Sequence, residues 1–178
     1  MRLDNIGDVV MTSPVLRALK ENLPASSITL MASPGGSKAA PLLPWVDEML
    51  PWRVLWQDLG SLSFDPTREW ELIKTLAAGK YDATVILTSF KQTPHAAAYA
   101  CALAGIPLRL GESKEWGGGV LTTEVPPAPD ELHQAERNLR LIEHAGFRVR
   151  DRSLGIRVPE EAGENTAALL EARGVAPG

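Results

Sequence analysis

Residues 81–105, YDATVILTSFKQTPHAAAYACALAG, decide the fold class because they predict a strand followed closely by a helix. Residues 81–88 are rich in β-branched side chains and bounded by turn residues, as buried strands of parallel sheets tend to be. Residues 93–104 open with a Thr-Pro pair and end before Gly105, which are start and stop signals of a helix. Their many small side chains suit close packing on a sheet.

The same alternation extends along the chain in both directions. Besides residues 27–32, which form a second predicted strand, there are three weaker strand candidates: residues 48–50, 108–110 and 155–158. Start signals and apolar stripes predict three more helices, at residues 65–79, 130–146 and 160–173. The sequence therefore predicts an α/β fold, a Rossmann-like doubly wound parallel sheet with helices on both faces.

The two ends of the chain interrupt this alternation. Residues 1–3 read as the end of a first strand, because a glycine turn and a helix follow at once. After the helix at residues 160–173 the pattern calls for another strand, but the sequence ends at Gly178. We therefore expect a single domain over residues 1–178 whose first strand is cut short.

Composition and charge restrict the classes of function. The net charge of −4 provides no general positive field, so no nucleic-acid partner is expected. Cys101 is the only cysteine and reads as a buried apolar residue, and the three histidines lack metal-ligand spacing with carboxylates, so no metal is expected. Because neither a secretion signal nor a membrane-spanning stretch is found, we expect the chain in the cytoplasm.

Gly7 and Asp8 lie at the turn between the first strand and the first helix, and such turns line the ligand crevice of α/β proteins. Gly7 permits backbone conformations that other residues avoid. By spacing alone, Asp8 is more readily explained as a helix cap than as a catalytic group. Ser13-Pro14 is a second possible helix start, which would leave residues 7–12 as a loop.

Residues 2–19, RLDNIGDVVMTSPVLRAL, resemble the opening signature of glycosyltransferase family 9, the ADP-heptose:lipopolysaccharide heptosyltransferases. The resemblance continues in four further segments: residues 46–48, 80–87, 105–111 and 133–139. It implies a GT-B fold, in which an N-terminal Rossmann-like domain holds the acceptor and a C-terminal one holds the nucleotide sugar. By this resemblance the chain is the acceptor-binding domain, and the donor-binding domain is missing from it.

The resemblance further implies that Asp8 is the carboxylate that takes the proton from the acceptor hydroxyl as this attacks the sugar's anomeric carbon. An aspartate is ionised at neutral pH, and the positive end of a helix favours that form. A weak base is sufficient where the hydroxyl becomes acidic late, in an oxocarbenium-like transition state. Alone, without a donor-binding domain, the chain is not expected to catalyse.

Partners follow from the same resemblance. The donor would be a nucleotide sugar, ADP-heptose, bound mainly by the missing domain, and no other cofactor is expected. The acceptor would be a cell-surface glycolipid or the lipopolysaccharide core, which implies peripheral contact with the inner face of the cytoplasmic membrane. The complete protein would then be a hexosyl- or heptosyl-type glycosyltransferase.

Four residues are candidates for binding the acceptor: Gly7, Lys91, His133 and Arg137. Lys91 follows the predicted strand at residues 81–88, which places it at the same crevice edge as Asp8, although a solvated lysine is the simpler interpretation. His133 and Arg137 share one helical stripe with Arg140 and His144, opposite the apolar face. Such stripes are usually solvated, which is the simpler interpretation; the place of His133 and Arg137 in a family-like segment is the reason to consider that they face the cleft.

Two other functions compete with glycosyl transfer. A non-catalytic binding or scaffold module that keeps this domain is the alternative. An unrelated Rossmann-like enzyme is disfavoured because no G-x-G-x-x-G follows the first strand, and residues 34–38, PGGSK, lack the frame of a nucleotide-binding phosphate loop.

Overall fold

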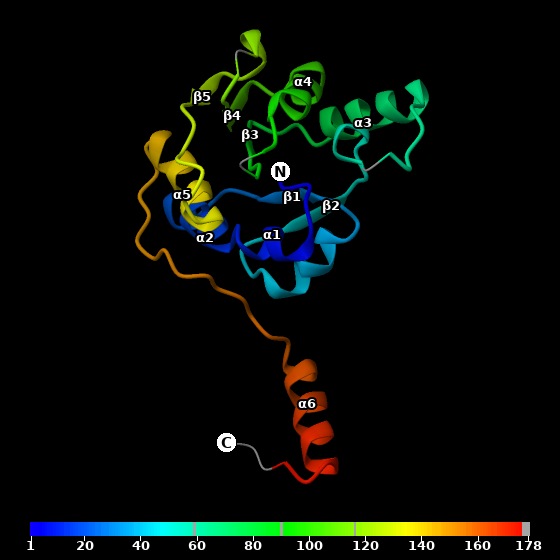
Figure 1. Ribbon diagram of the computed structural model, residues 1–178, viewed down its shortest axis with the longest axis vertical. Coiled ribbons are helices and arrows are strands. Elements are labelled where there is room, and N and C mark those ends of the chain that lie inside the picture. Colours follow the sequence, from blue (N-terminus) through cyan, green and yellow to red (C-terminus); the bar gives the residue numbers. More distant parts are fainter. Residues whose placement is uncertain (59, 90, 116, 176–178) are drawn as a thin grey trace.

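The computed structural model describes residues 1–58, 60–89, 91–115 and 117–175. Figure 1 shows a twisted sheet with helices packed on both of its faces, and one C-terminal helix standing away from this body. The predicted fold class, a Rossmann-like α/β sheet, is confirmed.

The strands are short and parallel, and the helices between them return the chain over the sheet. The strands are β1 (Thr29–Ala32), β2 (Glu48–Pro51), β3 (Ala83–Ile86), β4 (Leu108–Glu112) and β5 (Thr123–Val125). The α-helices are α1 (Ile6–Val10), α2 (Ser13–Asn22), α3 (Pro66–Ala78), α4 (His95–Leu103), α5 (Gln134–His144) and α6 (Glu160–Ala172). Three 3₁₀ turns complete the described elements: η1 (Gly36–Leu42), η2 (Leu55–Gln57) and η3 (Gly118–Val120).

Residues 1–3 join two groups of strands into one sheet. Arg2 N donates to Met31 O of β1 at 2.9 Å, and on the other side Leu87 N, just after β3, donates to Met1 O at 3.0 Å. The strand order is therefore β2, β1, residues 1–3, β3, β4, β5, with all pairings parallel. This is the doubly wound order, in which the first strand lies at the centre and the chain moves outward in both directions.

Each face of the sheet has its own apolar core. The face under α3 and α4 is built around Leu3, Met31, Leu72, Leu76, Ala100, Cys101 and Ile106. The face under α2 and α5 is built around Val15, Ala18, Leu87, Leu110, Leu139 and Ile142. Because successive strand residues point to opposite faces, this division follows from the strand pattern.

Helix boundaries agree with the sequence at some ends and differ at others. Asp65 caps α3 as predicted, its carboxylate accepting from Thr67 N at 2.9 Å. The predicted helix start at Asp130 is wrong, because α5 begins at Gln134 and His133 is its N-cap. The stop at Gly146 is confirmed by a positive φ of 90° directly after the helix.

Two strand predictions need correction. Residues 155–158 do not form a strand: they pair with none of the described strands, and their backbone N–H groups donate from Arg157 to Leu42 O and from Gly155 to Ser13 Oγ. The strand β5 was not predicted, because it has three residues and only Val125 is buried.

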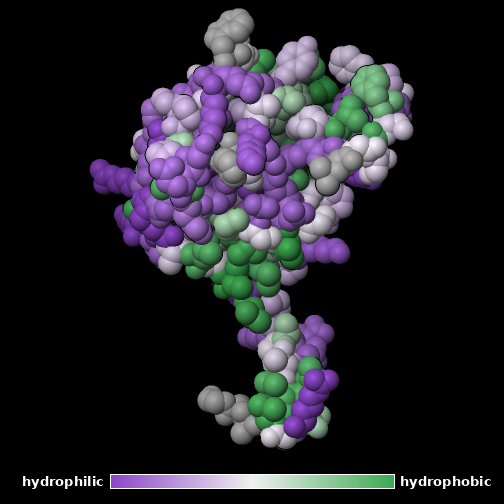
Figure 2. Space-filling model, viewed as in Figure 1, coloured by the Kyte–Doolittle hydropathy of each residue, from purple (hydrophilic) through white to green (hydrophobic). Residues whose placement is uncertain are grey.

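α6 is present where a helix was predicted, and none of its residues is buried. Figure 2 shows a hydrophobic strip along one side of this helix and hydrophilic residues along the other. The apolar strip includes Leu169, which is 54% exposed, and Leu170.

Cys101 offers a chemical probe of the packing of α4. The thiol is fully buried, and burial raises its pKa despite a hydrogen bond with Thr84, so the reactive thiolate is disfavoured. We expect alkylation of Cys101 by iodoacetamide at pH 8 to be at least about 100-fold slower in the native protein than in urea. The reason is that the buried thiol can react only when the core opens. Equal rates, after correction with free glutathione in the same solutions, would contradict the buried position of α4.

Candidate functional site

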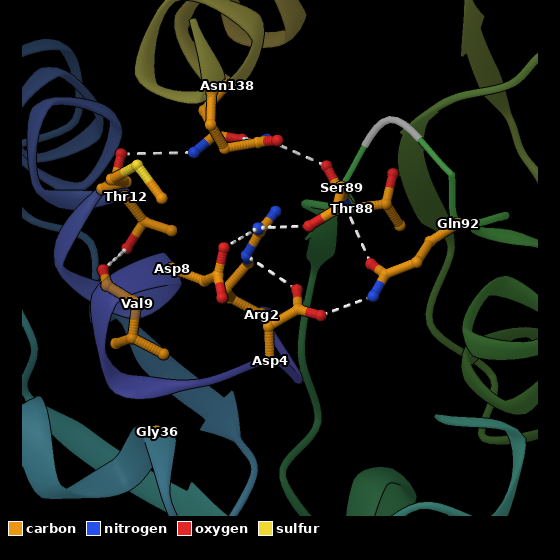
Figure 3. Close-up of polar contacts among 12 residues, drawn as sticks. Arg2, Asp4, Asp8, Val9, Thr12, Gly36, Thr88, Ser89, Gln92 and Asn138 are labelled. Atoms are coloured by element: carbon orange, nitrogen blue, oxygen red, sulfur yellow. Dashed lines mark hydrogen bonds and ion pairs between the residues drawn. The ribbon is translucent and has the colours of Figure 1, made fainter. Parts of the chain in front are cut away.

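The candidate site lies at the carboxyl ends of the two central strands. After residues 1–3 the chain turns into α1, which packs with η1 on one face of the sheet, whereas after β3 it turns into α4 on the other face. In doubly wound sheets, helices that depart to opposite faces mark a topological switch point, and ligands bind in the crevice expected there. The polar side chains that follow the two strands meet there (Figure 3).

A buried arginine organises these side chains. Arg2 is completely inaccessible to solvent, and its Nη2 donates to Asp8 Oδ1 and to Ser89 Oγ, each at 2.9 Å. On its other side Arg2 Nε lies 2.9 Å from Asp4 Oδ2, an ion pair whose atoms are not aligned for a hydrogen bond. One guanidinium thus lies between two carboxylates, as Figure 3 shows.

Asp4 is held from several directions. Its Oδ1 accepts hydrogen bonds from the side-chain amides of Gln57, in η2, and Gln92, in the loop after β3. The Gln92 amide is itself oriented, because its Oε1 accepts from Ser89 N at 2.9 Å. With its side chain only 10% exposed, Asp4 clamps two loops and Arg2 together rather than facing solvent.

Asp8 is the more accessible carboxylate. It is the third residue of α1, so it is not the N-cap; that position belongs to Asn5. The Asp8 side chain is 24% exposed, and its Oδ2 forms no hydrogen bond or ion pair with any residue that the structure describes. The sequence predicted that the positive end of a helix would favour the ionised form of Asp8. Because α1 is only five residues long, its dipole is small, and Arg2 supplies the main positive charge beside Asp8 instead.

Gly7 differs from its prediction. It lies inside α1 with an ordinary helical backbone and a φ that is not positive, so no special conformation requires glycine there. A Cβ added at Gly7 would meet no atom within 4 Å. The space at the Gly7 Cα is therefore open, and the role of Gly7 in binding the acceptor stays a prediction.

Lys91 lies where the sequence placed it. It is exposed in the loop between β3 and α4, the same loop that carries Ser89 and Gln92. The neighbouring Phe90 lies outside the described residues. Lys91 is thus at the edge of the crevice, and its contact with an acceptor stays a prediction.

Arg137 is buried, so the predicted polar stripe opposite the apolar face is wrong at this position; acceptor binding by Arg137 and His133 stays a prediction. Its side chain is buried between α5 and β4, where Nη1 is 2.5 Å from Glu112 Oε1 and Nη2 donates to Pro129 O at 2.7 Å. His133 is exposed but is used locally, its Nδ1 accepting from Ala135 N as the cap of α5. Structural roles therefore account for the contacts of Arg137 and His133.

The N-terminal turn of α5 still reaches the crevice through residues not singled out from the sequence. Gln134 Nε2 donates to Thr88 O, at the end of β3, at 3.0 Å. Asn138 receives a hydrogen bond from Gln134 and donates to Met11 O, between α1 and α2, at 3.2 Å. These amides connect α5 to the loops on both sides of Asp8.

Arg2 and Asp4 were overlooked as site residues, although both belong to the family-like signature. The available signal was an arginine inside a predicted central strand, because a buried charge requires a partner. Ser89 and Gln92 carried no such signal, since short polar residues are common in loops of any function.

The described residues form neither a metal-binding group nor a membrane-spanning helix. Within the described ranges, no three His, Cys, Asp or Glu side chains are grouped as a metal site requires. Among the described residues, no helix is both long and apolar enough to cross a bilayer.

Neither a family model nor a curated protein matches this chain, but three solved structures share its fold. The glycosyl transferase family 9 protein of Veillonella parvula has a TM-score of 0.71 at 19% identity, over 98% of this chain and 48% of its own. E. coli ADP-heptose lps heptosyltransferase II has a TM-score of 0.64 at 22% sequence identity, over 95% of this chain and 49% of its own. An E. coli heptosyltransferase solved with ADP has a TM-score of 0.57 at 16% sequence identity, over 98% of this chain and 65% of its own.

These comparisons confirm the predicted resemblance to family 9 at the level of the fold. The chain spans about half the length of two of these proteins and 65% of the third.

The buried pair of Arg137 and Glu112 gives a stability prediction. Arg137→Ala leaves the Glu112 carboxylate buried without its main partner, so the free energy of unfolding in urea should fall by about 3–5 kcal/mol. Arg140→Ala is the matched control, because Arg140 lies on the same helix and contacts the same carboxylate at 3.6 Å but is 35% exposed; its loss should cost at most about 1 kcal/mol. Equal losses in the two variants would contradict a structural role specific to Arg137.

Proposed function

We propose that this chain is the acceptor-binding part of a glycosyltransferase, with Asp8 as the base that receives the proton of the acceptor hydroxyl. The observation that carries the proposal is the Asp8 carboxylate, held on one oxygen, accessible on the other, and placed at the crevice of a doubly wound sheet. The fold shared with glycosyltransferases and the family-like signature around Asp8 support it.

The reaction requires few groups from this chain. The acceptor oxygen forms a bond to the anomeric carbon, the bond from that carbon to the diphosphate breaks, and the electron pair leaves with the nucleoside diphosphate. The hydroxyl proton passes to Asp8 Oδ2. Because the hydroxyl becomes acidic only as the new bond forms, a carboxylate is a sufficient base.

The donor and acceptor belong to the finer part of the proposal. Two of the three similar structures are named as heptosyltransferases, and the name of one of these two includes ADP-heptose and lps. We therefore propose a heptose or related sugar from ADP-heptose as the transferred group, and a lipopolysaccharide-type glycolipid as the acceptor. The nucleotide sugar would be bound by a second domain facing this crevice, at the inner surface of the cytoplasmic membrane.

Asp8→Asn tests the role of the carboxylate without changing its size. In the protein expressed from the complete reading frame, the rate of sugar transfer should fall by roughly 10²–10⁴-fold, because the amide cannot take up a proton. Donor binding, measured by calorimetry, should be unchanged. Asp82→Asn is a suitable control, since Asp82 is exposed beyond the other end of β3.

Unchanged turnover in Asp8→Asn would refute Asp8 as the base. Binding of a glycolipid acceptor with no transfer, even in the unaltered protein with the nucleotide sugar present, would favour a non-catalytic binding module instead.

A further inference from the structure

We propose that Arg2 is the positioning residue of this site: it holds Asp8 Oδ1 so that Oδ2 is the single oxygen presented to the acceptor hydroxyl. The proposal rests on the proposed function of Asp8 and adds to it the residue through which the carboxylate is oriented.

The first step of the argument is that Arg2 cannot move independently of the sheet. Its backbone N–H is bonded to Met31 O at 2.9 Å and its side chain is fully buried. Because Leu3 packs on the face of the sheet under α3 and α4, strand alternation directs Arg2 to the opposite face, where α1 carries Asp8. The guanidinium therefore reaches Asp8 from the rigid centre of the fold.

The second step is that the other edge of the guanidinium is also fixed. Arg2 Nε faces Asp4, whose carboxylate is bonded in turn by Gln57 and Gln92 from two different loops. Ser89 Oγ accepts from the same Nη2 that contacts Asp8. Rotation of the guanidinium away from Asp8 would break contacts on both of its edges, so the carboxylate of Asp8 is held in one orientation.

The third step concerns what the arrangement leaves unused. Arg2 Nη1 is buried and has no hydrogen-bond partner among the described residues, and Figure 3 shows it on the side toward Asn138. Nη1 therefore adds nothing to the hold on the guanidinium, which comes from Nη2 and Nε alone. Here the contacts with the two carboxylates determine the orientation.

The fourth step is the local charge. One guanidinium faces two carboxylates, so the cluster of Arg2, Asp4 and Asp8 retains a net negative charge of one. Asp4 is bonded on one oxygen and paired on the other, whereas Asp8 keeps one oxygen without a partner in the described part of the chain. Of the four carboxylate oxygens in the cluster, Asp8 Oδ2 is therefore the one left to accept a proton from the acceptor.

The test compares Arg2→Lys with Arg2→Met in the protein expressed from the complete reading frame. Lysine keeps the charge but offers one ammonium group in place of the planar fork that spans the two carboxylates. Methionine removes the charge at similar volume. Because it leaves the buried Asp4 carboxylate without its ion-pair partner, it should also lower the melting temperature, which is measured beside kcat for both variants. Both variants should lower kcat, the lysine variant by at least about 10-fold and the methionine variant by more, since small misplacements of a reacting group are costly.

The KM values for donor and acceptor should change by less than about 3-fold in both variants, because Arg2 is completely buried and so offers no surface to a substrate. The order of kcat should be arginine, lysine, methionine, whatever the order of thermal stability. A kcat that instead follows the melting temperature, or a loss confined to KM, would overturn the positioning role. Arg150→Lys, the same change at an exposed arginine, should leave both constants unchanged.

A double-mutant cycle tests whether Arg2 acts through Asp8. In an Asp8→Asn background, Arg2→Lys should reduce the residual rate by less than about 2-fold, because residues that act as a unit are not additive. Full additivity would refute the proposal. If Asp8→Asn alone leaves transfer unchanged, the proposed function fails; if Asp8→Asn abolishes transfer while both Arg2 variants keep their kcat, only this inference fails.

Discussion

The structure depends on the pairing of residues 1–3 between β1 and β3. Backbone hydrogen bonds to Met31 on one side and to Val85 and Leu87 on the other unite strands that would otherwise form two separate small sheets. The same pairing sets where α1 and α4 leave the sheet, and therefore where the crevice opens. It also brings the one charged residue of this segment, Arg2, into the interior.

A buried guanidinium is tolerated only when carboxylates accompany it, so the presence of Arg2 requires Asp4 and Asp8 to converge. Arg137, held by Glu112 between α5 and β4, follows the same physical rule with a different outcome. Both Glu112 and Asp4 are enclosed by protein, whereas Asp8 retains contact with solvent. Exposure of one oxygen, rather than the ion pair itself, distinguishes the candidate base from a structural carboxylate.

Much of the fold could be predicted from the sequence because strand and helix alternate with clear punctuation, as at Asp65 and Gly146. The residues around Asp8 were only partly predictable. Spacing suggested a helix cap at Asp8, but Asp8 lies inside the short helix α1, whose N-cap is Asn5, and the apolar stripe belongs to a separate helix, α2, which begins at the alternative start, Ser13. Arg137 was misplaced because charge suggested solvent, and a residue type alone does not reveal a partner such as Glu112 on a distant strand.

The clamp on Asp4 has a consequence for folding. Its contacts link residues 53 and 88 positions apart in sequence, and the bond from Arg2 to Ser89 spans 87. Such contacts form only after long loops have closed, which slows folding of parallel sheets. The orientation of Asp8 therefore cannot precede closure of the central sheet, and in a partly folded chain whose halves are still separate Asp8 would not yet be held by Arg2 and Ser89.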